Sequence, residues 1–157
     1  MLRKVGLMGP NKACPVILRN RDGEAELLAF RHPLAGIQLV KGSIERLESP
    51  AEAALRELQE EAGIASGHVL RCLGVWASGF QDQVWSFHEV WVSQELPESW
   101  SHFTADDGGQ TFSFFWHPLS AEPSDEWHAL FVGALSFIRR SLMTMEESPS
   151  GTQGQEP

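Results

Sequence analysis

Residues 42–64 read Gly42-Ser-Ile-Glu-Arg-Leu-Glu48-Ser-Pro-Ala-Glu-Ala-Ala-Leu-Arg56-Glu57-Leu58-Gln-Glu60-Glu61-Ala-Gly63-Ile64. Within this stretch, Ser49-Pro50-Ala51-Glu52 has the form of a capping box, in which each outer side chain binds the other residue's backbone amide, and proline suits the first helical position. Gly63 stands where a left-handed C-terminal cap is expected. The stretch therefore predicts a loop that leads into a helix over residues 50–62.

Three glutamates lie on one face of this expected helix. Glu57, Glu60 and Glu61 are three and four residues apart, and like charges at this spacing destabilise a helix by roughly a few tenths of a kcal/mol per pair. Arg56 is the one basic residue in 50–62 that can relieve them. A divalent cation removes the repulsion, and carboxylate oxygens suit Mg²⁺ or Mn²⁺. Taken alone, however, such glutamates are more often a solvated surface.

The complete spacing changes this interpretation. After Gly42 come five residues, a glutamate, seven residues, Arg-Glu, an apolar residue, any residue, Glu-Glu, any residue, a glycine and an apolar residue. This pattern resembles the box that defines the Nudix hydrolase family, and it is far more specific than a lone glycine motif. The resemblance implies an α/β fold, a Nudix-like α/β/α sandwich with a mixed sheet.

The resemblance also implies a metal site with Mg²⁺ or Mn²⁺ as cofactor. Glu57 and Glu61 are expected to bind the catalytic metal, and Gly42 to add its carbonyl oxygen. Glu60 is expected to be either a further ligand or the base that activates water. Bound water loses a proton more readily, and a carboxylate can accept it.

Four other residues are candidates for supporting roles. Arg56 is expected to orient the catalytic glutamates and Glu48 to brace the loop against the helix, although a purely structural role for both fits the sequence equally well. Arg31 and Lys41 are candidates for binding substrate phosphate, because a guanidinium fork and an ammonium both suit phosphate oxygens. Plain surface charge is the alternative for these two.

The resemblance implies hydrolysis of a phosphoanhydride in a nucleoside diphosphate-linked substrate. The pair Lys41-Gly42 resembles the branch that acts on dinucleoside polyphosphates or diphosphoinositol polyphosphates, and a dinucleoside polyphosphate is the leading expectation. Val40 and Leu47 depart from that branch, which usually has proline and often glycine there. Two alternatives stay open: removal of pyrophosphate from RNA 5′ ends, and a noncatalytic Nudix sensor that binds a nucleotide.

Outside the box the signals are weaker. An additional acid can complete such a site, and the candidates are Glu89, Asp106 and Asp107. A ring for nucleobase stacking can come from Trp85, Phe87, Trp91 or Trp116, although strand aromatics more often belong to the core. His32 and His88 have no second ligand at metal-site spacing, and we expect structural roles for both.

Strand-like segments surround the box. Apolar runs and turn residues predict strands near 13–19, 25–30, 37–40, 69–77, 84–93 and 111–116, the first two joined in a hairpin by Asn20-Arg21-Asp22-Gly23. A second helix is expected to begin at Ser124 or Asp125. Its apolar face comprises Trp127, Leu130, Phe131, Ala134, Ile138 and Leu142. Residues 1–145 are predicted to form one Nudix hydrolase domain, and 146–157, which lack apolar side chains, a disordered tail.

The composition limits the classes of partner and the cellular location that we expect for the protein. The net charge of −9 argues against broad attachment to nucleic acid or an anionic membrane, so an anionic nucleotide-like substrate is expected to need a cation. Two cysteines are too few for a disulfide framework, and we expect a reducing, cytoplasmic location. No run approaches membrane-spanning length.

Overall fold

The computed structural model describes residues 9–153, apart from the side chains at 107 and 147–153. Its elements, in chain order, are β1 (Lys12–Val16), β2 (Leu18–Arg21), β3 (Glu24–His32), β4 (Gly36–Gln38), β5 (Gly42–Ser43), α2 (Pro50–Ala62), β6 (Gly67–Ala77), β7 (Val84–Val92), β8 (Trp100–Thr104), the 3₁₀ turn η1 (Asp106–Gly108), β9 (Gln110–Pro118) and α3 (Ala129–Gln153).

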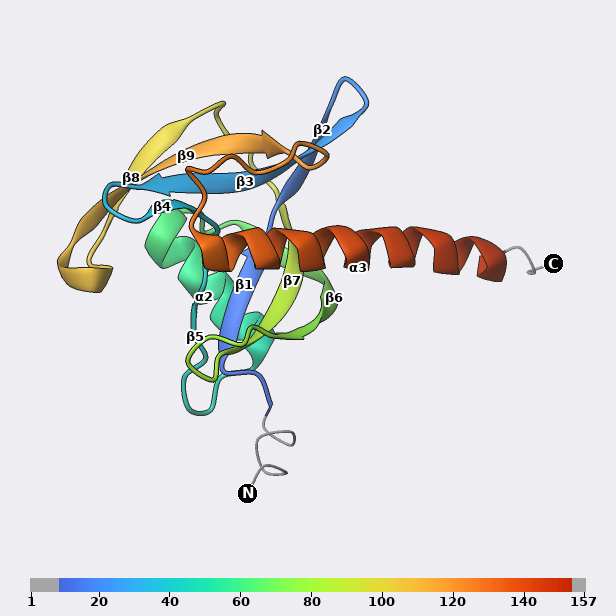
Figure 1. Ribbon diagram of the computed structural model, residues 1–157, viewed down its shortest axis with the longest axis horizontal. Helices are drawn as coiled ribbons and strands as arrows, with labels where there is room; N and C mark the ends of the chain where they lie inside the picture. Colours follow the sequence, from blue (N-terminus) through green and yellow to red (C-terminus); the bar gives the residue numbers. More distant parts are fainter. Residues whose placement is uncertain (1–8, 154–157) are drawn as a thin grey trace.

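The strands form two sheets (Figure 1). The first has the order β5-β1-β7-β6 and is mixed, because β1 and β7 run parallel while the other neighbours are antiparallel. The second is antiparallel with the order β2-β3-β9-β8, and β4 pairs with β3 beside it. The predicted mixed sheet is therefore present, together with an antiparallel sheet that the sequence did not predict.

Helices α2 and α3 cover opposite faces of the mixed sheet, and the alternation of side chains along β1 shows why. Cys14 and Val16 belong to the larger core with the apolar residues of α3, whereas Ala13 packs with Ala53 and Ala54 of α2. Successive side chains of a strand point to opposite faces, so one short strand serves both helices. The predicted α/β/α layering is confirmed.

Helix α2 begins and ends where the sequence predicts. The Ser49 hydroxyl accepts a hydrogen bond from the Glu52 amide at 3.0 Å, and the Glu52 carboxylate accepts one from the Ser49 amide at 2.9 Å. At the other end Gly63 has φ 76°, and its amide donates to the carbonyl of Gln59. Both caps follow from local sequence alone.

Three elements differ from the prediction. The strand expected over 13–19 divides at Ile17, because β1 pairs in the mixed sheet and β2 in the antiparallel one. Strand β8 was not predicted. Helix α3 begins at Ala129 rather than at Ser124 or Asp125, since the backbone of residues 126–128 hydrogen-bonds to both the amide and the carbonyl of Ile37.

Three further expectations concern the C-terminal tail, the two cysteines and membrane-spanning segments. Helical backbone of α3 continues to Gln153, while residues 154–157 lie outside the described residues, so the disordered tail over 146–157 stays a prediction. Cys14 is buried and Cys72 exposed, and both are free thiols in strands. Within the described part of the chain, no helix is both long and apolar enough to cross a membrane.

Candidate functional site

The box begins where two parts of the chain approach closely. Gly42 pairs with Ala13 at the edge of the mixed sheet, and α2 lies against it. A Cβ atom at Gly42 would lie 1.9 Å from Cδ of Glu57, far inside van der Waals contact. The Glu57 side chain therefore fills the space that any other residue at position 42 would need, and it is only 6% exposed.

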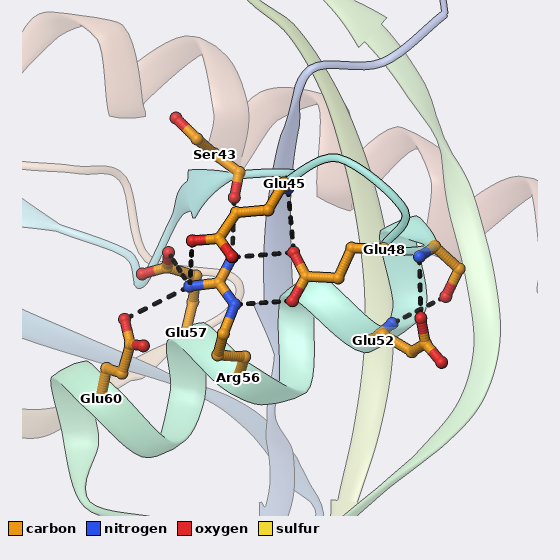
Figure 2. Close-up of polar contacts among 8 residues, drawn as sticks. Ser43, Glu45, Glu48, Glu52, Arg56, Glu57 and Glu60 are labelled. Atoms are coloured by element: carbon orange, nitrogen blue, oxygen red, sulfur yellow. Dashed lines mark hydrogen bonds and ion pairs between the residues drawn. The ribbon is translucent and has the colours of Figure 1, made fainter.

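Arg56 joins the loop to the helix (Figure 2). Its Nε and Nη2 donate to the two Glu48 oxygens at 2.6 and 2.9 Å, and Nη2 also donates to the Ser43 carbonyl at 2.8 Å. Glu48 further accepts the amide of Glu45 at 2.9 Å. The Arg56 hydrogen bond and this amide lower the pKa of Glu48 to about 2. A bidentate ion pair between Arg56 and Glu48 thus holds the loop to α2.

The same guanidinium reaches the expected metal-binding face. Nη1 of Arg56 lies 2.9 Å from Oε2 of Glu57 and 3.3 Å from Oε1 of Glu60. Glu60 is exposed, whereas Glu57 is buried. This geometry suits the orienting role expected for Arg56, because one rigid planar donor fixes the carboxylates relative to each other and to Glu48.

The buried carboxylates Glu57 and Glu61 resist losing their protons. Burial raises the pKa of Glu61 to about 9, helped by the negative charges of Glu57 and Asp106. Burial also raises the pKa of Glu57, against the lowering effect of Arg56. Two desolvated carboxylates side by side are stable when protonated or when a cation neutralises them.

Strand β8 closes the C-terminal end of α2. The last carbonyls of a helix have no partner within the helix. Here the Trp100 indole donates to the Ala62 carbonyl, and Nε2 of His102 to the Glu60 carbonyl, both at 3.1 Å. These contacts fix the antiparallel sheet against the helix end and determine where the chain emerges after β8.

The chain that follows β8 brings a fourth acid to the glutamates. Asp106 opens η1, and ligand oxygens of Glu57, Glu60 and Asp106 all lie within 4.8 Å of one another. The other two acids considered from the sequence differ: Glu89 pairs with Arg71 at 2.7 Å, and the side chain of Asp107 is outside the described part. No sequence motif distinguished Asp106, since its position depends on strand pairing.

A cavity of 370 Å³ opens beside these acids. One wall, here called the box wall, comprises Lys41, Gly42, Glu57 and Glu61. A second group of lining residues, here called the sheet wall, comprises Phe30, His32, Gln38, Asp106 and Phe112. Lys12 of β1 also lines the cavity. A pocket with few, convergent polar groups and carboxylates of perturbed pKa is a candidate active site.

A model of the NUDIX domain matches residues 9–133 of this chain. The chain belongs to the Nudix hydrolase family. Over 42 residues it is 45% identical to an ADP-ribose pyrophosphatase of Haemophilus influenzae, an alignment that spans 27% of this chain and 19% of that protein.

Solved structures of Nudix proteins share the fold. A C. elegans Ap4A hydrolase in a binary complex has a TM-score of 0.60 at 18% identity, covering 87% of this chain and 98% of that one. A UDP-X diphosphatase has a TM-score of 0.62 at 14% identity, covering 88% of this chain and 65% of that one. At such identities the likeness concerns the fold, and the predicted family and fold are confirmed.

The two predicted phosphate-binding residues of this Nudix hydrolase lie in different places. Lys41 lines the cavity, with Nζ 5.2 Å from the Trp85 ring centre. Arg31 does not line it, because neighbouring residues of β3 point to opposite faces, and it pairs with Glu126 at 3.0 Å. The phosphate-binding role of Arg31 remains a prediction that this geometry does not support. Lys12, which donates to Ser43 at 2.7 Å, was not predicted.

None of the four aromatic residues considered for base stacking lines the cavity. Trp85 and Phe87 are fully buried in the larger core. Trp91 and Trp116 line a separate groove, where Arg19 lies over the Trp116 ring at 4.3 Å. His32, for which the sequence indicated only a structural role, does line the cavity.

The acids of the site fit a hard divalent cation. Oxygens of Glu57, Glu60 and Asp106 converge, Glu57 and Glu61 are buried with raised pKa values, and the absence of a side chain at Gly42 gives Glu57 its place. Oxygen donors on rigid elements are what Mg²⁺ and Mn²⁺ prefer. The Gly42 carbonyl remains a predicted ligand.

Proposed function

We propose that this Nudix hydrolase is a pyrophosphohydrolase that uses Mg²⁺ or Mn²⁺ to cleave a phosphoanhydride in a nucleoside diphosphate-linked substrate. The observation that carries the proposal is the convergence of Glu57, Glu60 and Asp106 oxygens within 4.8 Å beside the cavity. Lysines at its edge supply the positive charge that an acidic protein needs around a diphosphate.

Each residue of the site has a part in this chemistry. Glu57, Glu61 and Asp106 would hold the metal, which when bound offsets charge on the phosphate oxygens and makes water easier to deprotonate. Glu60 is exposed, as Asp106 is, and it serves as a ligand or accepts the proton of the attacking water. Arg56 fixes Glu57 and Glu60, and Glu48 fixes Arg56.

Two substrates should be tested first. Dinucleoside polyphosphates follow from the Lys41-Gly42 pair at the head of the box. ADP-ribose follows from the short, 45% identical stretch shared with an ADP-ribose pyrophosphatase. Both contain a nucleoside 5′-diphosphate group, so one site of the proposed kind can accept either.

The deciding experiment is a hydrolysis panel with and without Mg²⁺. Diadenosine polyphosphates, ADP-ribose, UDP-sugars, nucleoside triphosphates and 5′-triphosphorylated RNA are assayed beside Glu60→Gln and Glu61→Gln. We expect Mg²⁺-dependent release of a nucleoside phosphate from at least one small substrate, and its loss in both variants. Turnover of the RNA alone would favour the RNA 5′ pyrophosphohydrolase. Tight nucleotide binding without turnover, unaffected by the substitutions, would establish a noncatalytic sensor instead.

A further inference from the structure

His32 is held in a single tautomer at the sheet wall. Its Nδ1 accepts the backbone amides of Leu34 at 3.0 Å and Ala35 at 3.2 Å. A nitrogen that accepts two amide protons carries none of its own, so the ring proton is on Nε2. Among the residues that the structure describes, none hydrogen-bonds Nε2. This N–H is therefore available to a molecule in the cavity that His32 lines.

Gln38 is oriented by the same turn. Its amide nitrogen donates to the Ala35 carbonyl at 3.3 Å, which assigns the nitrogen to that side of the side chain. The amide oxygen and one N–H remain for the cavity. The turn after β3 thus fixes a donor on His32 and an acceptor on Gln38.

The two side chains share one face of the β3–β4 hairpin. Phe30 pairs directly with Gln38 in the register, and His32 follows two residues after Phe30 on the same face. Behind them the Phe30 and Phe112 rings stack at 4.1 Å, and the His32 ring lies 5.3 Å from Phe112. Because this support is buried aromatic packing, the polar atoms are presented from a rigid, planar surface.

The cavity is lined by charged and by uncharged polar side chains, which suit different parts of a substrate. Lysines and carboxylates serve the diphosphate and its metal, whereas His32 and Gln38 offer an uncharged donor beside an uncharged acceptor. The edge of a nucleobase presents the complementary pair, an acceptor next to a donor, as adenine does with N7 and its amino group. The cavity volume of 370 Å³ lies in the range of small-molecule pockets, about 300–1,000 Å³.

We propose that His32 and Gln38 bind the nucleobase of the substrate by its hydrogen-bonding edge. This inference rests on the proposed function, and it deepens it by assigning base recognition to the β3–β4 hairpin. The four tryptophan and phenylalanine residues considered from the sequence have no part in it. A merely structural role of His32 would affect all substrates alike, whereas base recognition affects only those that carry a base.

The test compares substrates with and without a base. ADP-ribose, a UDP-sugar and diadenosine tetraphosphate carry a base, and 5-phosphoribosyl 1-diphosphate has none. His32→Phe keeps a planar ring without the donor, and Gln38→Met keeps the length without the amide. Loss of one neutral hydrogen bond weakens binding about 5- to 10-fold. We expect KM for base-containing substrates to rise by this factor, and kcat/KM to fall at least fivefold more than for the base-free substrate. His68→Phe is the matched control, because His68 packs on Trp91 outside the cavity.

Each outcome decides the inference. Equal losses on both kinds of substrate overturn it while the proposed function stands. Wild-type turnover of the base-free substrate alone overturns both the inference and the nucleoside-linked substrate of the proposed function. If the wild type hydrolyses neither kind, the proposed function fails, and calorimetric titration with ADP and UDP in Mg²⁺ decides the base site separately. Binding that weakens in His32→Phe and Gln38→Met but not in His68→Phe supports the inference, and absent or unchanged binding overturns it.

Discussion

The box wall is one loop and one helix joined by Arg56, whereas the sheet wall gathers residues from β3, β4, η1 and β9. The contacts that hold Glu57 of the box wall in place are close in sequence: Arg56 binds Glu57, its neighbour, and Glu48, eight residues before it. In the sheet wall the neighbours come from strands that are far apart in sequence and pair in the sheet, as with the stacked rings of Phe30 in β3 and Phe112 in β9. The comparison teaches that local sequence positions the glutamates of the box wall, whereas strand pairing positions the sheet wall, Asp106 included.

The largest expected effect comes from crowding the box wall. Gly42→Ala places a Cβ atom 1.9 Å from Cδ of Glu57, so the carboxylate must move away from Arg56 and from the proposed metal site. We expect turnover to fall about 10²- to 10³-fold, since metal stabilisation of the transition state amounts to several kcal/mol. Steady-state assays at saturating Mg²⁺ measure this. Gly9→Ala, with nothing within 4 Å, is the control and should leave turnover unchanged. Equal activity of both variants would contradict the proposed place of Glu57.

Asp106→Asn tests whether the sheet wall shares in metal binding. If Asp106 completes the site, the Mg²⁺ concentration for half-maximal activity should rise about 10- to 100-fold. This is the usual loss of metal affinity when a group that supports metal binding is removed. Glu89→Gln is the matched control, because Glu89 pairs with Arg71 instead. A Mg²⁺ dependence identical in wild type and Asp106→Asn would confine metal binding to the box wall.

Much of the box wall followed from the sequence, because caps and glutamate spacing are local properties. The helix bounds, the capping box and the close grouping of Glu57, Glu60 and Arg56 needed only residues 42–64. Asp106, Lys12 and His32 could not be placed in this way. Their positions depend on β8, on the β1–β5 pairing and on the β3–β4 turn, none of which leaves a periodic signal in the sequence.

A moderate effect is expected from pH in the metal-free protein. The pKa of Glu61 is about 9 when folded against 4.5 as its ordinary value, so between pH 7 and 9 the folded state holds a proton that the unfolded state has lost. The free energy of unfolding should therefore fall as pH rises, by at most about 1.4 kcal/mol per pH unit for this group.

Denaturant titrations in EDTA across pH 7 to 9 measure this slope. Glu61→Gln should flatten it, and saturating Mg²⁺ should do the same in the wild type by displacing the proton. The buried thiol of Cys14, whose pKa is raised by burial, adds a slope of the same sign near pH 9 in both proteins. An unchanged slope in Glu61→Gln would show that this carboxyl is ionised in the metal-free fold.

The smallest effect concerns the loop that leads into the box wall. Leu47 has φ 73° and is 95% exposed, in the loop between β5 and α2. Leu47→Gly should stabilise the protein by roughly 1 kcal/mol through relief of left-handed strain, about 2–4 °C in Tm. Calorimetry can check this. Leu34→Gly is the control, because Leu34 is also exposed but does not have a positive φ. This substitution should not raise Tm.

The two amide contacts at Nδ1 of His32 have a spectroscopic consequence. An imidazole locked in one tautomer gives two well-separated ring-nitrogen resonances in an NMR spectrum, where a freely exchanging ring gives averaged ones. A molecule that accepts the Nε2 proton shifts that resonance and leaves the other nearly unmoved. The Nε2 resonance of His32 can therefore report whether a molecule occupies the cavity, even when no substrate is hydrolysed.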